Sequence, residues 1–203
     1  MERLQKKLRL LGPLLLALGV TVPATAQDTP KAEISIGYQV LGFSGEIDET
    51  FTKGWYVDVA GNVTPLFGIV FELGGNYKSV SEAVTVLGVT STFTGDLDVH
   101  EFMAGIRLNA RPNPTVTPFG QILVGGVRGS ANISGSVTAG GQTLFAASDA
   151  LSGTDFALQI GGGINLRISD GVGIRAGADY IRIFAEDEGI GGFRFGVGAV
   201  FPF

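Results

Sequence analysis

Residues 193–203 read FRFGVGAVFPF, and the alternation in this stretch decides the fold. One face of the stretch is apolar and carries Phe193, Phe195, Val197, Ala199, Phe201 and Phe203. The other face carries Arg194, two glycines, Val200 and Pro202. A period of two is the pattern of a β-strand, and a strand of about 9–11 residues is long enough to cross a bilayer. The stretch therefore predicts a strand that spans a membrane.

The same alternation recurs upstream, and no segment between the runs shows the period of an amphipathic helix. The further runs cover residues 33–40, 55–63, 67–74, 101–108, 117–129, 155–167 and 174–180. Both faces of the run 117–129 are fairly apolar. With the last strand, these runs predict an all-β fold, an eight-stranded antiparallel up-and-down transmembrane β-barrel.

The connections between the predicted strands alternate in length. Short ones fall at 62–66, 109–115 and 169–171, and mostly longer ones at 42–50, 78–92, 130–153 and 185–191. Barrels of the bacterial outer membrane have short periplasmic turns and longer extracellular loops. We therefore expect the four longer segments to be loops outside the cell.

The composition favours lipid over water around this barrel. Glycine occurs 32 times, and only 16% of the residues are charged. The polar faces hold carboxylates and arginines together, so buried charges can pair, whereas an eight-stranded interior has little room for the many phenylalanines. Each phenylalanine that faces hydrocarbon contributes roughly 1.5–3 kcal/mol. We expect the apolar faces to point outward into acyl chains.

The first residues have the three parts of a secretory signal. Residues 1–9 are basic, residues 10–20 are mostly apolar, and Ala24-Thr25-Ala26 supplies the small side chains that a signal peptidase requires. The apolar run is too short for a membrane-spanning helix. We expect a cleaved signal peptide at 1–26, export through the Sec pathway, and a barrel domain at 27–203.

The polar faces of the strands bring charges of both signs into the predicted lumen. We expect a mixed-sign network that plugs it, built from Asp58, Glu72, Glu101, Arg107, Arg175, Asp179 and Arg194. The alternative is a narrow, gated path for ions between the same residues.

Few residues offer catalytic or metal chemistry. Asp96, Asp98 and His100 share one face of a strand, but their phase is the outward one, so we expect a solvated strand end. His100 is the only histidine, and the chain has no cysteine. The chain without its signal is acidic, which argues against nucleic acid as a partner. We expect no catalytic residues, no cofactor and no metal.

Three motifs resemble the small OmpA-like outer-membrane β-barrel domain family. They are VTPFGQ at 116–121, IGGGINLR at 160–167 and the FRFGVG that begins at Phe193. The end of the chain, with Phe203 and Phe201 on one face, resembles the signal read by the barrel assembly machinery. Pro202 departs from that pattern, because proline cannot donate to a strand ladder.

The resemblance implies a location in the cell outer membrane, with membrane lipid, lipopolysaccharide and the barrel assembly machinery as partners. We expect a non-enzymatic protein that serves envelope structure or binds, through its outer loops, a partner that the sequence does not identify. The alternatives are a porin-like channel, a lipid A-modifying enzyme, and a soluble periplasmic barrel that holds an apolar ligand.

Overall fold

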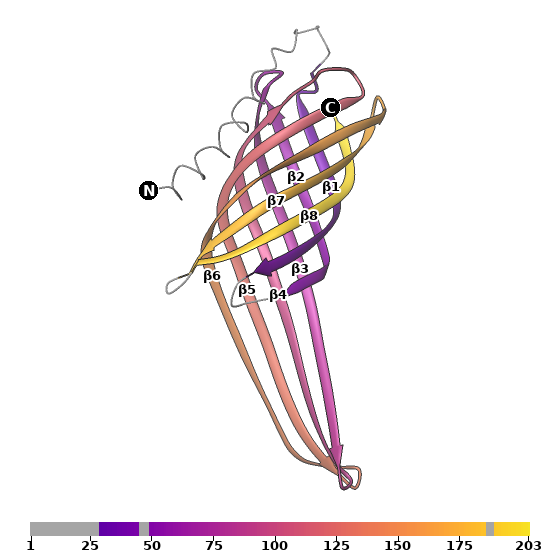
Figure 1. Ribbon diagram of the computed structural model, residues 1–203, viewed down its shortest axis with the longest axis vertical. Helices are drawn as coiled ribbons and strands as arrows, with labels where there is room; N and C mark the ends of the chain where they lie inside the picture. Colours follow the sequence, from indigo (N-terminus) through magenta and orange to yellow (C-terminus); the bar gives the residue numbers. More distant parts are fainter. Residues whose placement is uncertain (1–28, 45–48, 186–188) are drawn as a thin grey trace, which may run out of the picture.

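Eight antiparallel strands close into a barrel in the computed structural model, which describes residues 29–44, 49–185 and 189–203 (Figure 1). The strands are β1 (Ala32–Ser44), β2 (Thr50–Asn62), β3 (Phe67–Val86), β4 (Val89–Asn109), β5 (Val116–Ala139), β6 (Gln142–Ser169), β7 (Val172–Phe184) and β8 (Gly189–Pro202). Each strand pairs with its neighbours in sequence, and β1 pairs with β8 to close the ring. The predicted fold is confirmed. The predicted signal peptide lies outside the described residues.

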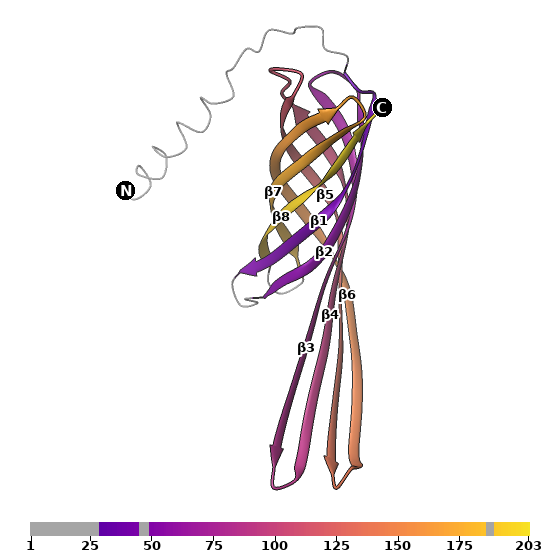
Figure 2. The same ribbon diagram turned by 90° about the vertical axis from the view of Figure 1, so that its right-hand side faces the viewer.

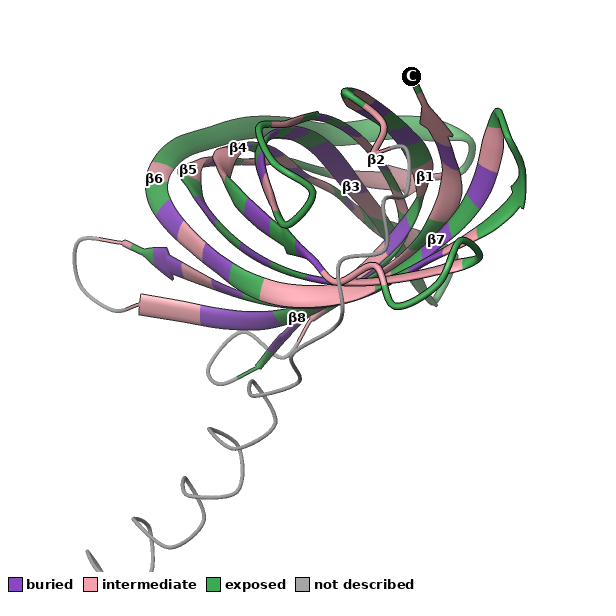
Figure 3. Ribbon diagram, turned by 90° about the horizontal axis from the view of Figure 1, so that it is seen from above, coloured by how far each residue is buried: buried purple, intermediate pink, exposed green. Residues whose placement is uncertain are grey.

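The strands face the way that their alternation predicts. Phe71, Ile164 and Phe195 are exposed on the outside of the barrel, whereas Glu72 and Arg194 are buried within it. Figure 3 shows the strands from above, with buried and more exposed residues following one another along them. Closure pairs the backbone N–H and C=O groups of all eight strands, which is what a chain needs in a medium without water. The run 117–129, in which both faces are fairly apolar, also alternates between the two sides of the wall. Phe119, Leu123 and Val127 are buried in the barrel, and Ile122 is exposed on its outside.

Two of the four predicted outer loops are wrong. The segment 78–92 belongs to β3 and β4, which continue to a turn at Leu87 and Gly88. The segment 130–153 belongs to β5 and β6, which meet at Gly140 and Gly141. All four turn residues have positive φ, between 51° and 80°. Two-residue turns with positive φ match the twist of a β-hairpin, so the chain forms hairpins here instead of loops.

These hairpins lie side by side, because β4 stays paired with β5 as far as Val89 and Ala139. Residues 78–97 and 130–153 thus form a four-stranded outer sheet that projects far beyond the barrel (Figures 1 and 2). The strands β1, β2, β7 and β8 end much earlier, at the outer mouth of the barrel. One side of the barrel wall therefore continues outward and the other side stops.

The outer sheet has two unlike faces. On the face that continues the outer wall of the barrel, a row of hydroxyl side chains crosses all four strands: Ser81, Thr94, Ser134 and Ser148. The face that continues the lumen wall, here called the lumen-side face, is mostly apolar. It carries Val80, Val84, Phe93, Leu97, Ile133, Val137, Phe145 and Leu151, together with Lys78, Glu82 and Asp149.

The short connections are as predicted, at residues 63–66, 110–115 and 170–171. They lie at the end of the barrel that is opposite the outer sheet. The C-terminus lies at the same end as these short connections (Figure 1). Because outer-membrane barrels keep short turns on the periplasmic side, this end is periplasmic and the outer sheet is extracellular. Among the described residues, no helix is long and apolar enough to span a membrane.

Candidate functional site

Arg194 on β8 binds three carboxylates inside the barrel. Its Nη1 lies 2.5 Å from Oε1 of Glu72 and 3.0 Å from Oε2 of Glu101, and its Nη2 lies 2.8 Å from Oδ2 of Asp179. The three acids come from β3, β4 and β7, so one guanidinium ties four strands together. All four side chains are buried, where an unpaired charge would be costly.

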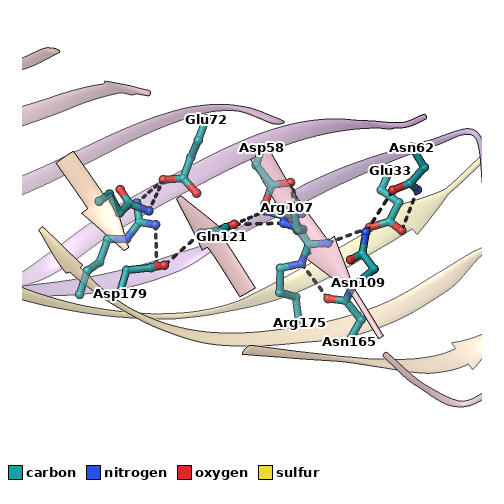
Figure 4. Close-up of polar contacts among 12 residues, drawn as sticks. Glu33, Asp58, Asn62, Glu72, Arg107, Asn109, Gln121, Asn165, Arg175 and Asp179 are labelled. Atoms are coloured by element: carbon teal, nitrogen blue, oxygen red, sulfur yellow. Dashed lines mark hydrogen bonds and ion pairs between the residues drawn. The ribbon is translucent and has the colours of Figure 1, made fainter. Parts of the chain in front are cut away.

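A second group lies nearer the periplasmic end and centres on Asp58 of β2 (Figure 4). Arg175 Nη1 lies 2.6 Å from Asp58 Oδ2, and Arg107 Nη1 lies 3.2 Å from Asp58 Oδ1. The two guanidinium carbons also lie 4.7 and 5.1 Å from the ring centroid of Phe119. Because the aromatic face is electron-rich, Phe119 helps to hold two like charges close together.

Glu33 on β1 joins this second group to the periplasmic turn. Its Oε2 lies 2.9 Å from Arg175 Nη2, and its Oε1 lies 3.1 Å from Nη2 of Arg111 in the connection between β4 and β5. Arg111 also donates to the carbonyl of Pro65. Burial lowers the pKa of Arg111, and the Glu33 carboxylate opposes that shift.

Gln121 on β5 connects the two groups. Its Oε1 accepts hydrogen bonds from Arg107 Nε and Nη2 at 3.0 and 2.8 Å, and its Nε2 donates to Asp179 Oδ1 at 3.0 Å. The result is one continuous set of contacts across the barrel (Figure 4). The cavity left among these side chains has a volume of about 20 Å³. That is room for about one water molecule.

The structure brings together all seven residues singled out in the sequence, and it divides them into two groups. Asp58 contacts Arg107 and Arg175 and not Arg194. Sequence reasoning missed Glu33, Arg111 and Gln121 as members. Glu33 and Gln121 alternate with outward apolar residues, so their phase was a usable signal. Arg111 lies in a turn, where alternation carries no information.

The group Asp96, Asp98 and His100 lies on β4 near the outer mouth. His100 Nε2 lies 3.3 Å from the hydroxyl of Tyr77, which also accepts a hydrogen bond of 3.1 Å from Trp55 Nε1. The rings of Tyr77 and His100 meet edge to face, with centroids 5.6 Å apart. In the described part of the chain, no three His, Asp or Glu residues are grouped as metal ligands would be.

The C-terminal strand remains paired beyond Pro202. The amide of Phe203 donates to the carbonyl of Ala32 at 2.8 Å, and the Phe203 carbonyl accepts from the amides of Lys31 and Ala32 at 2.6 and 3.2 Å. Pro202 lies opposite Glu33 in the register between β8 and β1. The missing donor of Pro202 therefore does not end the ladder, and Phe203 stays next to β1 with its ring exposed.

At the outer mouth the interior changes from charged to apolar. A cavity of about 400 Å³ opens there, on top of a buried apolar cluster. Phe43, Phe51, Val99, Val127 and Ile183 form its floor and walls, and all five are buried. Leu97 and Leu151, at the base of the lumen-side face, continue the lining outward.

A closed barrel with an apolar exterior and an ion-paired interior defines an integral β-barrel membrane protein of the outer-membrane type. Residues 13–203 match the model of the outer membrane protein beta-barrel domain. The chain therefore belongs to this family and is a protein of the bacterial outer membrane, which confirms the predicted location and the resemblance.

Solved structures with this fold support the architecture. The attachment invasion locus protein Ail of Yersinia pestis, in complex with the heparin analogue sucrose octasulfate, is 18% identical, with a TM-score of 0.53; the match covers 85% of this chain and 99% of Ail. Neisserial surface protein A is 10% identical, with a TM-score of 0.54, over 87% of this chain and all of that protein. At these identities the likeness shows the fold alone. A comparison with curated protein sequences gives no match.

Proposed function

We propose that the protein binds a macromolecular partner at the cell surface through the lumen-side face of its outer sheet, and that its lumen is closed to ions. The observation that supports this proposal is that one face of the outer sheet is apolar and the other is polar. Phe93, Ile133 and Leu151 are between 38% and 62% exposed on one face, whereas hydroxyl side chains cover the other. A contiguous exposed apolar patch on a protein surface marks an interaction site.

The charge of the outer sheet narrows the kind of partner. Lys78 is its only basic residue, and Lys78 forms an ion pair with Glu49. A sulfated ligand such as the one bound to Ail requires a basic surface, and this sheet offers none. An apolar protein surface fits the lumen-side face better than a polyanion does.

Attaching a photocrosslinker to each face in turn tests this function. The chain has no cysteine, so Ile133→Cys and Ser134→Cys each carry one unique thiol, on opposite faces at neighbouring positions of β5. With a benzophenone on that thiol, we expect crosslinked adducts on intact cells from position 133 and few from position 134. Gel shifts and peptide mass spectrometry measure the adducts.

The matched position controls for crosslinking by mere proximity. Equal adduct yields from the two faces, or none from position 133 in the native host, would show that the apolar face meets no partner. The same gels, unboiled against boiled, report whether each variant is folded.

The rival function is a small ion channel. The ion-paired network and its residual cavity of about 20 Å³ support a closed lumen, because a hydrated ion needs a wider path. We expect no single-channel conductance from the protein in planar bilayers. Glu72→Ala removes one carboxylate from the network, and we expect it to remain silent also. Discrete conductance steps in the wild-type protein that change with Glu72→Ala would favour the channel instead.

The proposal also assigns no enzymatic role to the barrel. His100 faces outward and contacts Tyr77, away from the carboxylates in the lumen. For assembly, we propose that Phe201 and Phe203 form the signal read by the barrel assembly machinery. Their place on the last strand, at the seam with β1, supports this role, because the seam is where the barrel closes.

A further inference from the structure

The cavity at the outer mouth is built into the barrel wall by two glycines. Gly129 on β5 and Gly153 on β6 face each other in register, in phase with the lumen side. A Cβ atom added at either position would meet nothing within 4 Å. Their neighbours in the same phase are larger: Val127 toward the floor, and Ala131 and Leu151 toward the outer sheet. The missing side chains at this row leave the hollow.

The volume and lining of this hollow suit a small apolar ligand. Its volume of about 400 Å³ lies within the range of ligand sites, about 300–1,000 Å³. The floor is closed by buried side chains such as Phe51 and Val99, so a ligand must enter from outside the cell. From there the apolar lining continues through Leu97 and Leu151 along the lumen-side face. An elongated apolar path of this kind fits an alkyl chain.

The charges at the hollow select the head group of that ligand. Three charged residues of the described chain line the hollow, and all three are acidic: Glu49, Asp98 and Asp155. Glu49 already pairs with Lys78, and Asp98 is on the outward phase of β4. Asp155 is in phase with the lumen side, and none of the ion pairs between described residues includes it. A cationic head is therefore complementary and an anionic head is repelled.

We propose that this hollow binds a single-chain amphiphile with a cationic head, its alkyl chain against Phe51, Val99 and Val127 and its head beside Asp155. This site is separate from the proposed protein partner of the outer sheet, which would meet Ile133 farther from the membrane.

Photolabelling in a defined bilayer tests the site. The probe is dodecyltrimethylammonium with a diazirine near the end of its chain, added to the full barrel in phosphatidylcholine nanodiscs. Peptide mass spectrometry then locates the labels. We expect saturable labelling of peptides that contain Phe51, Leu97 or Leu151, in addition to weak, non-saturable labelling of lipid-facing segments. Unlabelled dodecyltrimethylammonium should compete, and tetramethylammonium and dodecyl sulfate should not.

Filling the hollow provides a matched pair of variants. Gly129→Leu places a side chain in open space, and we expect it to lower the saturable labelling at least about tenfold. Gly126→Leu lies on the same strand but faces outward, where an added Cβ makes only ordinary contacts, and we expect no change. Asp155→Asn keeps the size of the side chain and removes its charge. In this variant we expect unlabelled dodecyltrimethylammonium to compete about tenfold more weakly than in the wild-type protein. Competition by uncharged dodecanol should be the same in both proteins.

Labels confined to lipid-facing segments of the wild-type protein would overturn the proposal. So would equal saturable labelling in Gly129→Leu and Gly126→Leu. Equal competition by dodecyl sulfate would overturn the assignment of the head group. The competition series uses only wild-type protein, and unboiled gels verify that each variant is folded, so misfolding cannot mimic either result.

Discussion

Replacing Arg194 with alanine is expected to lower the free energy of unfolding of the barrel by about 3–5 kcal/mol or more. The reason is that one guanidinium neutralises three buried carboxylates: Glu72, Glu101 and Asp179. Without it, three buried acids from three strands would face one another with no positive charge between them. Urea titration of the protein in lipid vesicles, followed by the shift between its folded and unfolded gel bands, measures the loss.

Two further substitutions separate charge from geometry. Arg194→Lys keeps the positive charge, but a single ammonium cannot reproduce the planar fork that reaches three acids, so we expect an intermediate loss. Arg128→Ala removes an exposed arginine that donates a long hydrogen bond of 3.5 Å to Ser152, and we expect a change within about 0.5 kcal/mol. A loss below about 1 kcal/mol for Arg194→Ala would mean that the three acids do not depend on this arginine.

The second large effect is expected where the barrel closes. Gly37 on β1 and Gly198 on β8 lie opposite each other, and each approaches the backbone of the other strand. A Cβ on Gly198 would meet the carbonyl oxygen of Ile36 and lie 2.6 Å from the Cα of Gly37. Backbone atoms cannot rotate away as a side chain can, so Gly198→Ala should cost about 1–3 kcal/mol and weaken the seam.

Gly61→Ala on β2 is the matched control, because nothing lies within 4 Å of its added Cβ and its φ is not in the positive region. Alanine there restricts the unfolded chain, and we expect a gain of about 0.4–1 kcal/mol. The two variants should therefore move the unfolding midpoint in opposite directions. Equal midpoints would show that the seam accommodates a methyl group and that the close approach is relaxed in solution.

Alternation alone predicted the fold because the bilayer and the lumen place opposite demands on successive residues. Phe71 and Glu72 are adjacent in sequence, yet one faces lipid and the other an ion pair. The same rule predicted which charges point inward. It did not predict which charges meet, because strand tilt brings Asp58 to Arg175 of β7, and a single strand's pattern carries no information about tilt.

The outer hairpins were not predicted, and the reason is different. Beyond the membrane, serine and threonine are as compatible with a strand as with a loop, so segments such as 130–139 look like polar connections. The Gly140-Gly141 pair was the available signal for a hairpin turn. The hollow at Gly129 and Gly153 was not predictable, since an empty space depends on what several strands together leave out.

The β3–β4 hairpin is paired without interruption from the barrel to its two-residue tip, and the β5–β6 hairpin is paired to its tip with one irregularity, between Val137 and Thr138. A strand rises about 3.3 Å per residue, so residues 130–139 place the tip of their hairpin about 30 Å beyond the barrel. Because these residues are paired in a sheet, they hold the tip more rigidly than a coil would. The tips at Leu87-Gly88 and Gly140-Gly141 are consequently fixed in height and make few contacts of their own. A peptide epitope inserted at either tip would be displayed beyond the lipid headgroups, at a distance set by the length of the hairpin. The insertion would leave the packing of the barrel unchanged.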